Sequence, residues 1–342
     1  MTRFNTLSRA GAATAGGLLA TLGGLAARYA WHQRRIDRAW LSQTATSLDS
    51  LGEVDHVSIV PLVERLTPAS GLRGEPGVSY LVRTLGTTLL FDTGLNARGE
   101  AHSALVHNAE TLKLDIRNLD GVVISHLHGD HVGGPRTAFR RTFALSAEAL
   151  EPRGLAAYVP TDMRHGRADV VVTTGPRVVA QGMAVLPPLP ANMFRLGPLA
   201  EQVLVINVRG FGLVLVSGCG HPGIERMLAA TEHVLDTPIR GVVGGLHLPV
   251  HPFGTPLLVQ GTLGNPNWPW RPVSEQDVAA AIREISARGP RIVALSSHDS
   301  TPWTCDAFGA AFGDQYRTLQ VGDELSISAG GVVCHPYDRP AA

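Results

Sequence analysis

The feature that most constrains the fold of this chain is a dense group of histidines that directly follows a short apolar run. Residues 121–124 read GVVI, a β-branched, uncharged run that is typical of a buried strand. The next ten residues read SHLHGDHVGG and contain His126, His128, Asp130 and His131, in a chain that has 14 histidines among 342 residues. The group is therefore predicted to lie on a strand-to-helix loop at the carboxyl end of the strand, where α/β folds commonly hold their sites.

The spacing of these four side chains indicates a metal ion. His126 and His128 point to the same side of an extended segment, because side chains alternate with a period of two, and Asp130 and His131 follow at the turn. Imidazole nitrogens and carboxylate oxygens are ligands that suit zinc, iron and manganese. Surface histidines that cap a helix are the alternative, but three histidines with an aspartate at this spacing favour the metal site.

Three further histidines follow apolar runs in the same way. His221 follows LVLVSGCG, His247 follows VVGGL, and His298 follows RIVALSS. Each alone is compatible with an ordinary loop histidine, but together they predict loops that converge at one edge of a sheet. Because the candidate site residues run from Asp92 to His298 and must meet, one large domain over residues 51–342 is a better interpretation than two domains.

Composition excludes several classes of function. The formal net charge is zero and no basic block stands out beyond the N-terminal stretch, which argues against a nucleic-acid partner. The single lysine, Lys113, lies in a polar helical stretch and no GxxxxGK motif occurs, so Schiff-base chemistry and a phosphate-binding P-loop are disfavoured. The three cysteines form no CxxC pair and no disulfide framework.

The first fifty residues are predicted to form a separate N-terminal unit. Residues 10–27 are uncharged and rich in glycine and alanine, and their number is close to the minimum for a membrane span. A cleaved secretory signal is the alternative, since two arginines precede the segment. The four arginines at positions 28, 34, 35 and 38 follow it and disfavour export. We therefore expect a membrane anchor and linking helix over residues 1–50, with the catalytic domain in the cytoplasm.

The pattern HxHxDHxGG resembles the signature of the metallo-β-lactamase fold superfamily. Residues 88–94 (TLLFDTG) and 213–228 (LVLVSGCGHPGIERML) are similar to two other segments of that superfamily, and the resemblance covers about residues 54–333. It implies an α/β chain with a four-layer αββα sandwich, to which the alternating strand and helix patterns conform. It also implies two divalent metal ions at one edge between the sheets, with zinc as the first candidate and iron or manganese as alternatives.

The resemblance further implies roles for the site residues. The first metal is assigned to His126, His128 and His221. The second metal is assigned to Asp130, His131 and His298. Asp130 can also act as a catalytic base, and His247 is either a ligand in place of His298 or a proton donor to the leaving group. Asp92 is either an acceptor that orients a ligand histidine or a turn-forming residue.

The chain departs from most of the superfamily in two places. No histidine occurs between residues 167 and 220, and Cys219 stands where a bridging aspartate is expected. The dihydropterin ribofuranosylaminobenzene phosphate synthase-like branch is similar here, with GCSH, GGxHL and HCTG where this chain has GCGH, GGLHL and SHDS. Cys219 is then either a thiolate ligand or a small buried side chain.

These features predict a metal-dependent hydrolase of a small-molecule ester, lactone, thioester or phosphodiester. The alternatives are a transferase that acts on a pterin-like phosphate, for which Arg136, Arg195 and Trp270 are candidates, and a non-catalytic, membrane-tethered binding protein. The Pro/Gly-rich stretch over residues 249–272, which carries Trp268 and Trp270, is either a flap over the site or a surface excursion.

Overall fold

The computed structural model describes residues 4–41, 47–48, 50–68, 71–252, 261, 264–268 and 270–337, with residues 4–20 and 41 described by backbone alone. Two large β-sheets form its centre. The first sheet contains, in spatial order, β17 (Gly331–Pro336), β16 (Asp323–Ser328), β1 (His56–Val63), β2 (Ser79–Arg83), β3 (Thr88–Phe91), β4 (Gly121–Val123), β5 (Ala156–Val159) and β6 (Asp169–Val172). The second contains β15 (Tyr316–Thr318), β14 (Ile292–Leu295), β13 (Ile239–Gly244), β12 (Gly212–Ser217), β11 (Leu204–Val208), β8 (Met183–Val185) and β7 (Arg177–Ala180).

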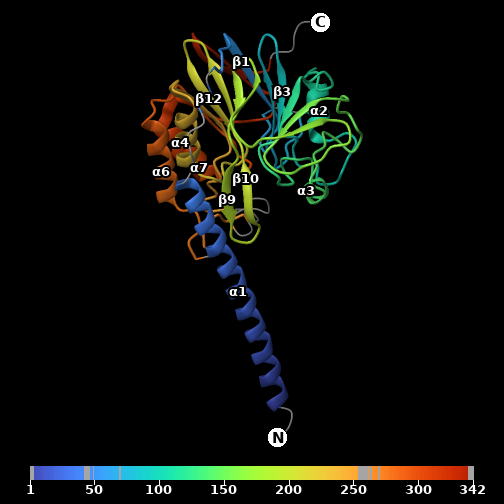
Figure 1. Cartoon of the computed structure of the whole chain (residues 1–342), viewed down its shortest axis with the longest axis vertical. Helices are drawn as coiled ribbons and strands as arrows, with labels where there is room; N and C mark the ends of the chain where they lie inside the picture. The colour runs from blue at the N-terminus through green and yellow to red at the C-terminus, as the bar shows by residue number, and fades with distance from the viewer. Residues whose placement is uncertain are drawn as a thin grey trace.

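Helices cover the outer face of each sheet, so that the domain has four layers (Figure 1). The helices are α2 (Ala104–Thr111) and α3 (Pro135–Phe139) beside the first sheet, and α4 (Ile224–Val234), α6 (Glu275–Ser286) and α7 (Pro302–Phe312) beside the second, followed by the short η1 (Gly313–Gln315). This arrangement confirms the predicted αββα sandwich.

Three apolar clusters correspond to the three interfaces between the four layers. Ile59 and Val82 of the first sheet meet Val214 and Val243 of the second in the central cluster. The outward-facing side chains of the same strands pack under the helices. Strands of continuous β-branched and leucine residues are buried on both faces in this way, which is why runs such as residues 213–216 contain no polar side chain.

The predicted alternation of strands and helices is present. β2 pairs with β3 across Leu85 and Gly86, and β11 pairs with β12 across Arg209 and Gly210, each antiparallel. Four short strands between residues 177 and 201 were not predicted: β7, β8, β9 (Leu189–Met193) and β10 (Gly197–Glu201). β9 and β10 pair in a small separate hairpin. Their proline and asparagine residues interrupt the apolar, β-branched run by which a strand is recognised in a sequence.

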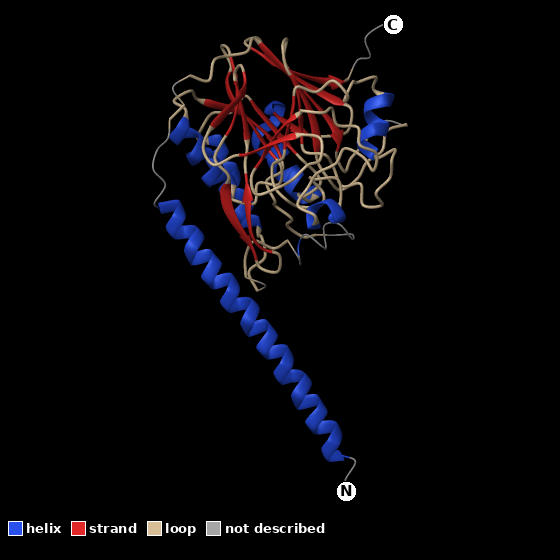
Figure 2. Cartoon of the chain, turned by 45° about the vertical axis from the view of Figure 1, so that its right-hand side comes forward, coloured by secondary structure: helices blue, strands red, loops and turns tan. Residues whose placement is uncertain are grey.

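A long helix, α1 (Phe4–Leu41), projects from the domain, and Figure 2 shows its N-terminal part away from the sheets. Within the described residues, no helix combines the length and the apolar character that crossing a membrane requires, so the predicted membrane span is not confirmed. The last part of the predicted linking helix, residues 42–46 and 49, lies outside the described residues.

The C-terminal half of α1 packs against the domain. The Tyr29 side chain is 5% exposed, its hydroxyl donates to the Pro266 carbonyl oxygen at 2.6 Å, and its ring lies 4.8 Å from that of Trp268. Trp270 is 75% exposed. The predicted flap is only partly described, because its residues 253–260, 262–263 and 269 lie outside the described residues. Within the described part, Trp268 packs against Tyr29 of α1.

Candidate metal centre

The order of the strands brings the predicted ligands together. β12, β13 and β14 are parallel neighbours, so their carboxyl ends meet at one edge, and His221, His247 and His298 follow these three strands in turn. The loop with residues 126–131 follows β4 of the facing sheet. Gly218 allows the two sheets to approach here, because a Cβ at this position would collide with the Ser125 hydroxyl.

Three histidines form the first cluster: His126, His128 and His221. The Nδ1 atom of His128 lies 3.1 Å from Nε2 of His126 and 3.2 Å from Nε2 of His221. Nitrogen ligands in a tetrahedral zinc site lie about 3.3 Å apart, since each Zn–N bond is about 2.0–2.1 Å long. The three nitrogens therefore face a common point with the spacing that a small divalent cation needs.

The second cluster consists of Asp130, His131, Cys219 and His298. Each offers one donor atom, and the four atoms lie within 4.8 Å of one another. The Cys219 sulfur is 3.1 Å from Nε2 of His131 and 3.2 Å from Nε2 of His298. The structure thus brings together all six predicted ligands in the two predicted sets, and the chemistry of both sets fits zinc or iron.

Asp92 orients His131 from the end of β3. Its carboxylate oxygen Oδ2 accepts a hydrogen bond from Nδ1 of His131 at 2.7 Å, and Oδ1 accepts one from the Ser125 amide at 2.7 Å. With Nδ1 as the donor, Nε2 of a neutral His131 ring has a free lone pair directed into the second cluster. Such carboxylate–histidine pairs fix the orientation and basicity of metal ligands.

A buried chain of hydrogen bonds also orients His298. Its Nδ1 atom lies 2.5 Å from the Ser296 hydroxyl, and Ser296 in turn contacts the Glu64 carboxyl group, which also accepts a hydrogen bond from Tyr80 at 2.7 Å. Glu64, Tyr80 and Ser296 are fully buried. Burial raises the pKa of Glu64 from 4.5 to about 7, although its hydrogen bonds to Ser296 and Tyr80 favour the charged form.

The raised pKa of Glu64 gives a stability prediction. Because the folded state binds this proton more tightly than the unfolded state, the stability that Glu64 confers is complete below pH 4.5 and is lost as the pH rises through about 7. Glu64→Gln cannot ionise, so its free energy of unfolding relative to wild type should rise by about 2–3 kcal/mol between pH 5 and pH 8. Urea denaturation at both pH values measures this. Glu225→Gln, at an exposed position of α4, should show no such change.

Two buried carboxylates that no sequence pattern indicated, Glu201 and Asp299, hold the ligand loops. Glu201 accepts hydrogen bonds from the amides of Cys219, Gly220 and His221 at 2.7–3.0 Å. Asp299 accepts one from the His247 amide at 2.8 Å. The position of Glu201, directly before the apolar run of β11, was the only sequence signal for its role.

His247 lies beside the first cluster. Its ring centroid is 4.5 Å from that of His221, and with Cys219 and His221 it forms a third group of potential ligands. Its Nε2 atom donates to the Gly264 carbonyl oxygen at 2.7 Å, and its buried Nδ1 atom has no hydrogen-bond partner among the described residues. A neutral His247 can therefore only accept at Nδ1, and it lies beside His221 rather than in the place of His298.

The electrostatics of the centre favour neutral imidazoles, with one exception. Burial lowers the pKa of His128 to about 4 and that of His298 to about 3, and it holds the pKa values of His126 and His221 well below their usual range. Burial also opposes protonation of His131, but the neighbouring aspartates outweigh it and raise the pKa to about 9. The site thus concentrates lone pairs next to negative charge, which attracts a cation.

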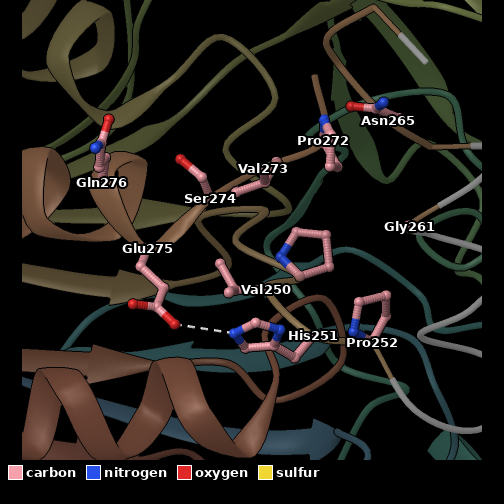
Figure 3. A pocket seen from close by; sticks show the side chains of 11 residues that line it. Val250, His251, Pro252, Gly261, Asn265, Pro272, Val273, Ser274, Glu275 and Gln276 are labelled. Atoms are coloured by element: carbon pink, nitrogen blue, oxygen red, sulfur yellow. Dashed lines mark hydrogen bonds and ion pairs between the residues drawn. The ribbon is translucent and has the colours of Figure 1, made fainter. Parts of the chain in front are cut away.

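The predicted ligands differ in their exposure to solvent. Four of the six predicted ligands are buried, and His128 and Asp130 are partly exposed. A separate cavity of about 660 Å³ is lined in part by the loop that follows His247, where His251 is directed at Glu275 (Figure 3). None of the predicted metal ligands lines this cavity, and His128 and Asp130 are the two ligands that solvent partly reaches.

The fold and this centre define the class of protein. Residues 72–183 match the family model of the metallo-beta-lactamase superfamily. The solved structure of Tm1679, a metal-dependent hydrolase of the beta-lactamase superfamily, is 21% identical with a TM-score of 0.56, over 80% of this chain and 99% of that one. The chain therefore has the metallo-β-lactamase fold, and it is an enzyme of that fold.

A curated relative is similar over part of the chain. It is 7,8-dihydropterin-6-methyl-4-(beta-D-ribofuranosyl)-aminobenzene-5'-phosphate synthase of Methanocaldococcus jannaschii, which is 25% identical in an alignment 248 residues long. The alignment covers 59% of this chain and 81% of the relative. The predicted resemblance to the superfamily and to this branch is confirmed, and the alternative of a non-catalytic binding protein is not supported.

Proposed function

We propose that the protein is a hydrolase that uses two divalent metal ions, with zinc as the first candidate, to cleave an ester, lactone, thioester or phosphodiester bond. The observation that supports this most directly is the convergence of two donor sets from loops of both sheets. His126, His128 and His221 would hold one ion, and Asp130, His131 and His298 the other. Ions held there would lower the pKa of a shared water towards about 7 and supply hydroxide at neutral pH.

The protein's own side chains would position the substrate and move protons. Asp130 has a 24% exposed side chain and lies 3.7 Å from Nε2 of His131, so one carboxylate oxygen can face the substrate side. His247 is restricted to accepting at Nδ1 while neutral, and burial lowers its pKa to about 4. We therefore assign Asp130 the acid–base role and His247 a supporting role as acceptor or ligand.

Metal content and substrate class can be tested together. The full chain is the appropriate material, because Tyr29 of α1 packs against Pro266 and Trp268 and a truncation at residue 45 would remove this contact. We expect two metal ions per chain by elemental analysis and turnover of one class among model phosphodiesters, lactones, thioesters and carboxylic esters. His126→Ala and His221→Ala should lose the turnover and bind fewer than two ions per chain. Unchanged activity in these two variants would reject the proposal.

A transferase that acts on a phosphate-bearing aromatic substrate is the second candidate. The similarity to the synthase of Methanocaldococcus jannaschii favours it. The candidate residues for such a substrate, Arg136, Arg195 and Trp270, are all exposed. Mass spectrometry of the full chain incubated with a dihydropterin phosphate and an aminobenzoate separates the two candidates, because a transferase makes a larger product and a hydrolase makes smaller ones.

A further inference from the structure

The segment over residues 264–268 links helix α1 to a side chain of the metal centre. At one end of it, the carbonyl oxygen of Gly264 accepts a hydrogen bond from Nε2 of His247 at 2.7 Å. Two residues further on, the carbonyl oxygen of Pro266 accepts one from the Tyr29 hydroxyl at 2.6 Å. Gly264, His247 and Tyr29 are all buried. One short stretch of backbone therefore connects α1 to the imidazole of His247.

This segment is held together by hydrogen bonds of its own. The Asn265 side chain accepts one from the Asn267 amide at 3.0 Å and donates one to the Trp268 carbonyl oxygen at 3.2 Å. The Asn265 carbonyl oxygen accepts another from the Phe194 amide at 3.0 Å. A turn that is tied in this way is expected to move as a unit. A shift at the end that contacts α1 should therefore reach the carbonyl oxygen at the other end.

The bond to Gly264 decides which nitrogen of His247 is available. A carbonyl oxygen can only accept, so Nε2 carries the proton of the neutral ring and Nδ1 keeps its lone pair. Nδ1 is buried and has no hydrogen-bond partner among the described residues. The ring lies 4.5 Å from that of His221, in a group of potential ligands that also contains Cys219. The position of the Gly264 carbonyl thus controls what His247 offers to the centre.

Tyr29 is well suited to fix this segment. Its ring lies 5.5 Å from that of Phe194 and 4.8 Å from that of Trp268, so its hydroxyl is surrounded by apolar groups and needs a partner. Burial raises the pKa of Tyr29, so the hydroxyl keeps the proton that it donates. The backbone of Tyr29 is held as well, because Asn192 of β9 donates to its carbonyl oxygen at 3.0 Å.

We propose that Tyr29 is a positioning residue of the metal centre. By holding the segment over residues 264–268, its hydroxyl keeps the Gly264 carbonyl oxygen against Nε2 of His247 and directs the Nδ1 lone pair towards the first cluster. This inference rests on the proposed function, because it gives α1 a part in that site. Since α1 ends at Leu41 and the match to the family model covers residues 72–183, this support lies outside the matched part of the chain.

The tautomer of His247 tests this inference without metal or substrate. Long-range ¹H–¹⁵N magnetic resonance spectra of the metal-free full chain distinguish a ring proton on Nε2 from one on Nδ1, and the signal that is missing in His247→Ala identifies the ring. We expect the Nε2–H tautomer in the wild type and a mixture of tautomers in Tyr29→Phe, which removes only the hydroxyl. A pure Nε2–H signal in Tyr29→Phe would overturn the inference.

Tyr316→Phe is the matched control. It also removes a single tyrosine hydroxyl, which contacts the Thr318 hydroxyl at 3.0 Å in β15, the edge strand of the second sheet. Neither the tautomer of His247 nor the activity should change in this variant. A change of tautomer as large as that in Tyr29→Phe would show that the signal reports general loosening of the fold, and the inference would be rejected.

Kinetics of the metal-loaded enzyme give the second measurement. Tyr29→Phe should lower kcat/KM by about 3–10-fold, the factor that corresponds to one hydrogen bond. It should have no further effect in the His247→Ala background, because the side chain that it positions is then absent. An unchanged kcat/KM, or an equal fall in both backgrounds, would contradict the inference. If the wild type turns over none of the model substrates, the proposed function fails, and the tautomer measurement still decides the role of Tyr29.

Discussion

Alanine in place of His131 should abolish the hydrolytic activity and reduce the metal content from two ions per chain towards one. His131 is fully buried, and its ring contacts the Asp92 carboxylate at 2.7 Å and the Cys219 sulfur at 3.1 Å. Its loss therefore removes one ligand and leaves both of these groups without their partner. Loss of an outer partner of a metal ligand alone costs about 10–100-fold in affinity or activity, so loss of the ligand should lower kcat/KM by more than about 100-fold. Steady-state kinetics and elemental analysis measure the two effects.

Two other variants serve as comparisons for His131→Ala. Asp92→Asn keeps the shape of the side chain that orients His131 but removes its charge, and we expect a smaller loss, about 10–100-fold, with both ions retained at saturating metal. His107→Ala changes a partly exposed histidine of α2 whose ring contacts the Gly71 carbonyl oxygen, and it should leave both measurements unchanged. A His131→Ala protein that keeps two ions and full activity would contradict the assignment of this residue as a ligand.

The fold was predictable where a strand has a strong local pattern. The runs that became β2, β3, β11 and β12 are β-branched and end at clear turns, so their hairpins followed from the sequence. The segment Leu189–Met193 contains a proline and an asparagine and has no such pattern. It forms β9 because it pairs with β10, and Asn192 donates to the Tyr29 carbonyl oxygen of α1. These contacts are tertiary, and a local pattern cannot indicate them.

Some residues of the candidate site were also predictable from the sequence, and others were not. Histidines that follow apolar runs were recognisable one by one, because each marks the end of a strand, and the parallel order of β12, β13 and β14 then places them at one edge. The supporting carboxylates were not recognisable. Glu64 is 232 residues from Ser296, which it contacts, and Glu201 has partners 18–20 residues further along the chain. An acidic residue in sequence is usually exposed, so only the folded structure reveals that these two are buried.

The second large effect should come from Glu201→Ala, which removes a buried side chain that touches no predicted metal position. Glu201 is 0% exposed and accepts the amides of Cys219, Gly220 and His221. Alanine leaves three buried N–H groups without an acceptor, and each such group costs about 1–3 kcal/mol. We expect the free energy of unfolding of the metal-free protein to fall by about 4 kcal/mol, measured by urea denaturation.

The same variant should also lower the affinity for both metal ions. Substitution of a single ligand is expected to affect mainly the ion that this ligand holds. Cys219 lies in the second cluster and His221 in the first, and the Glu201 carboxylate fixes the backbone of both. His131→Ala should spare the first ion, whereas Glu201→Ala should lower the affinity for both ions in a metal titration. Glu201→Gln retains one acceptor oxygen and should give an intermediate loss. If Glu201→Ala binds two ions with unchanged affinity, the loop positions its ligands without this carboxylate, and the coupling of the two clusters through Glu201 is wrong.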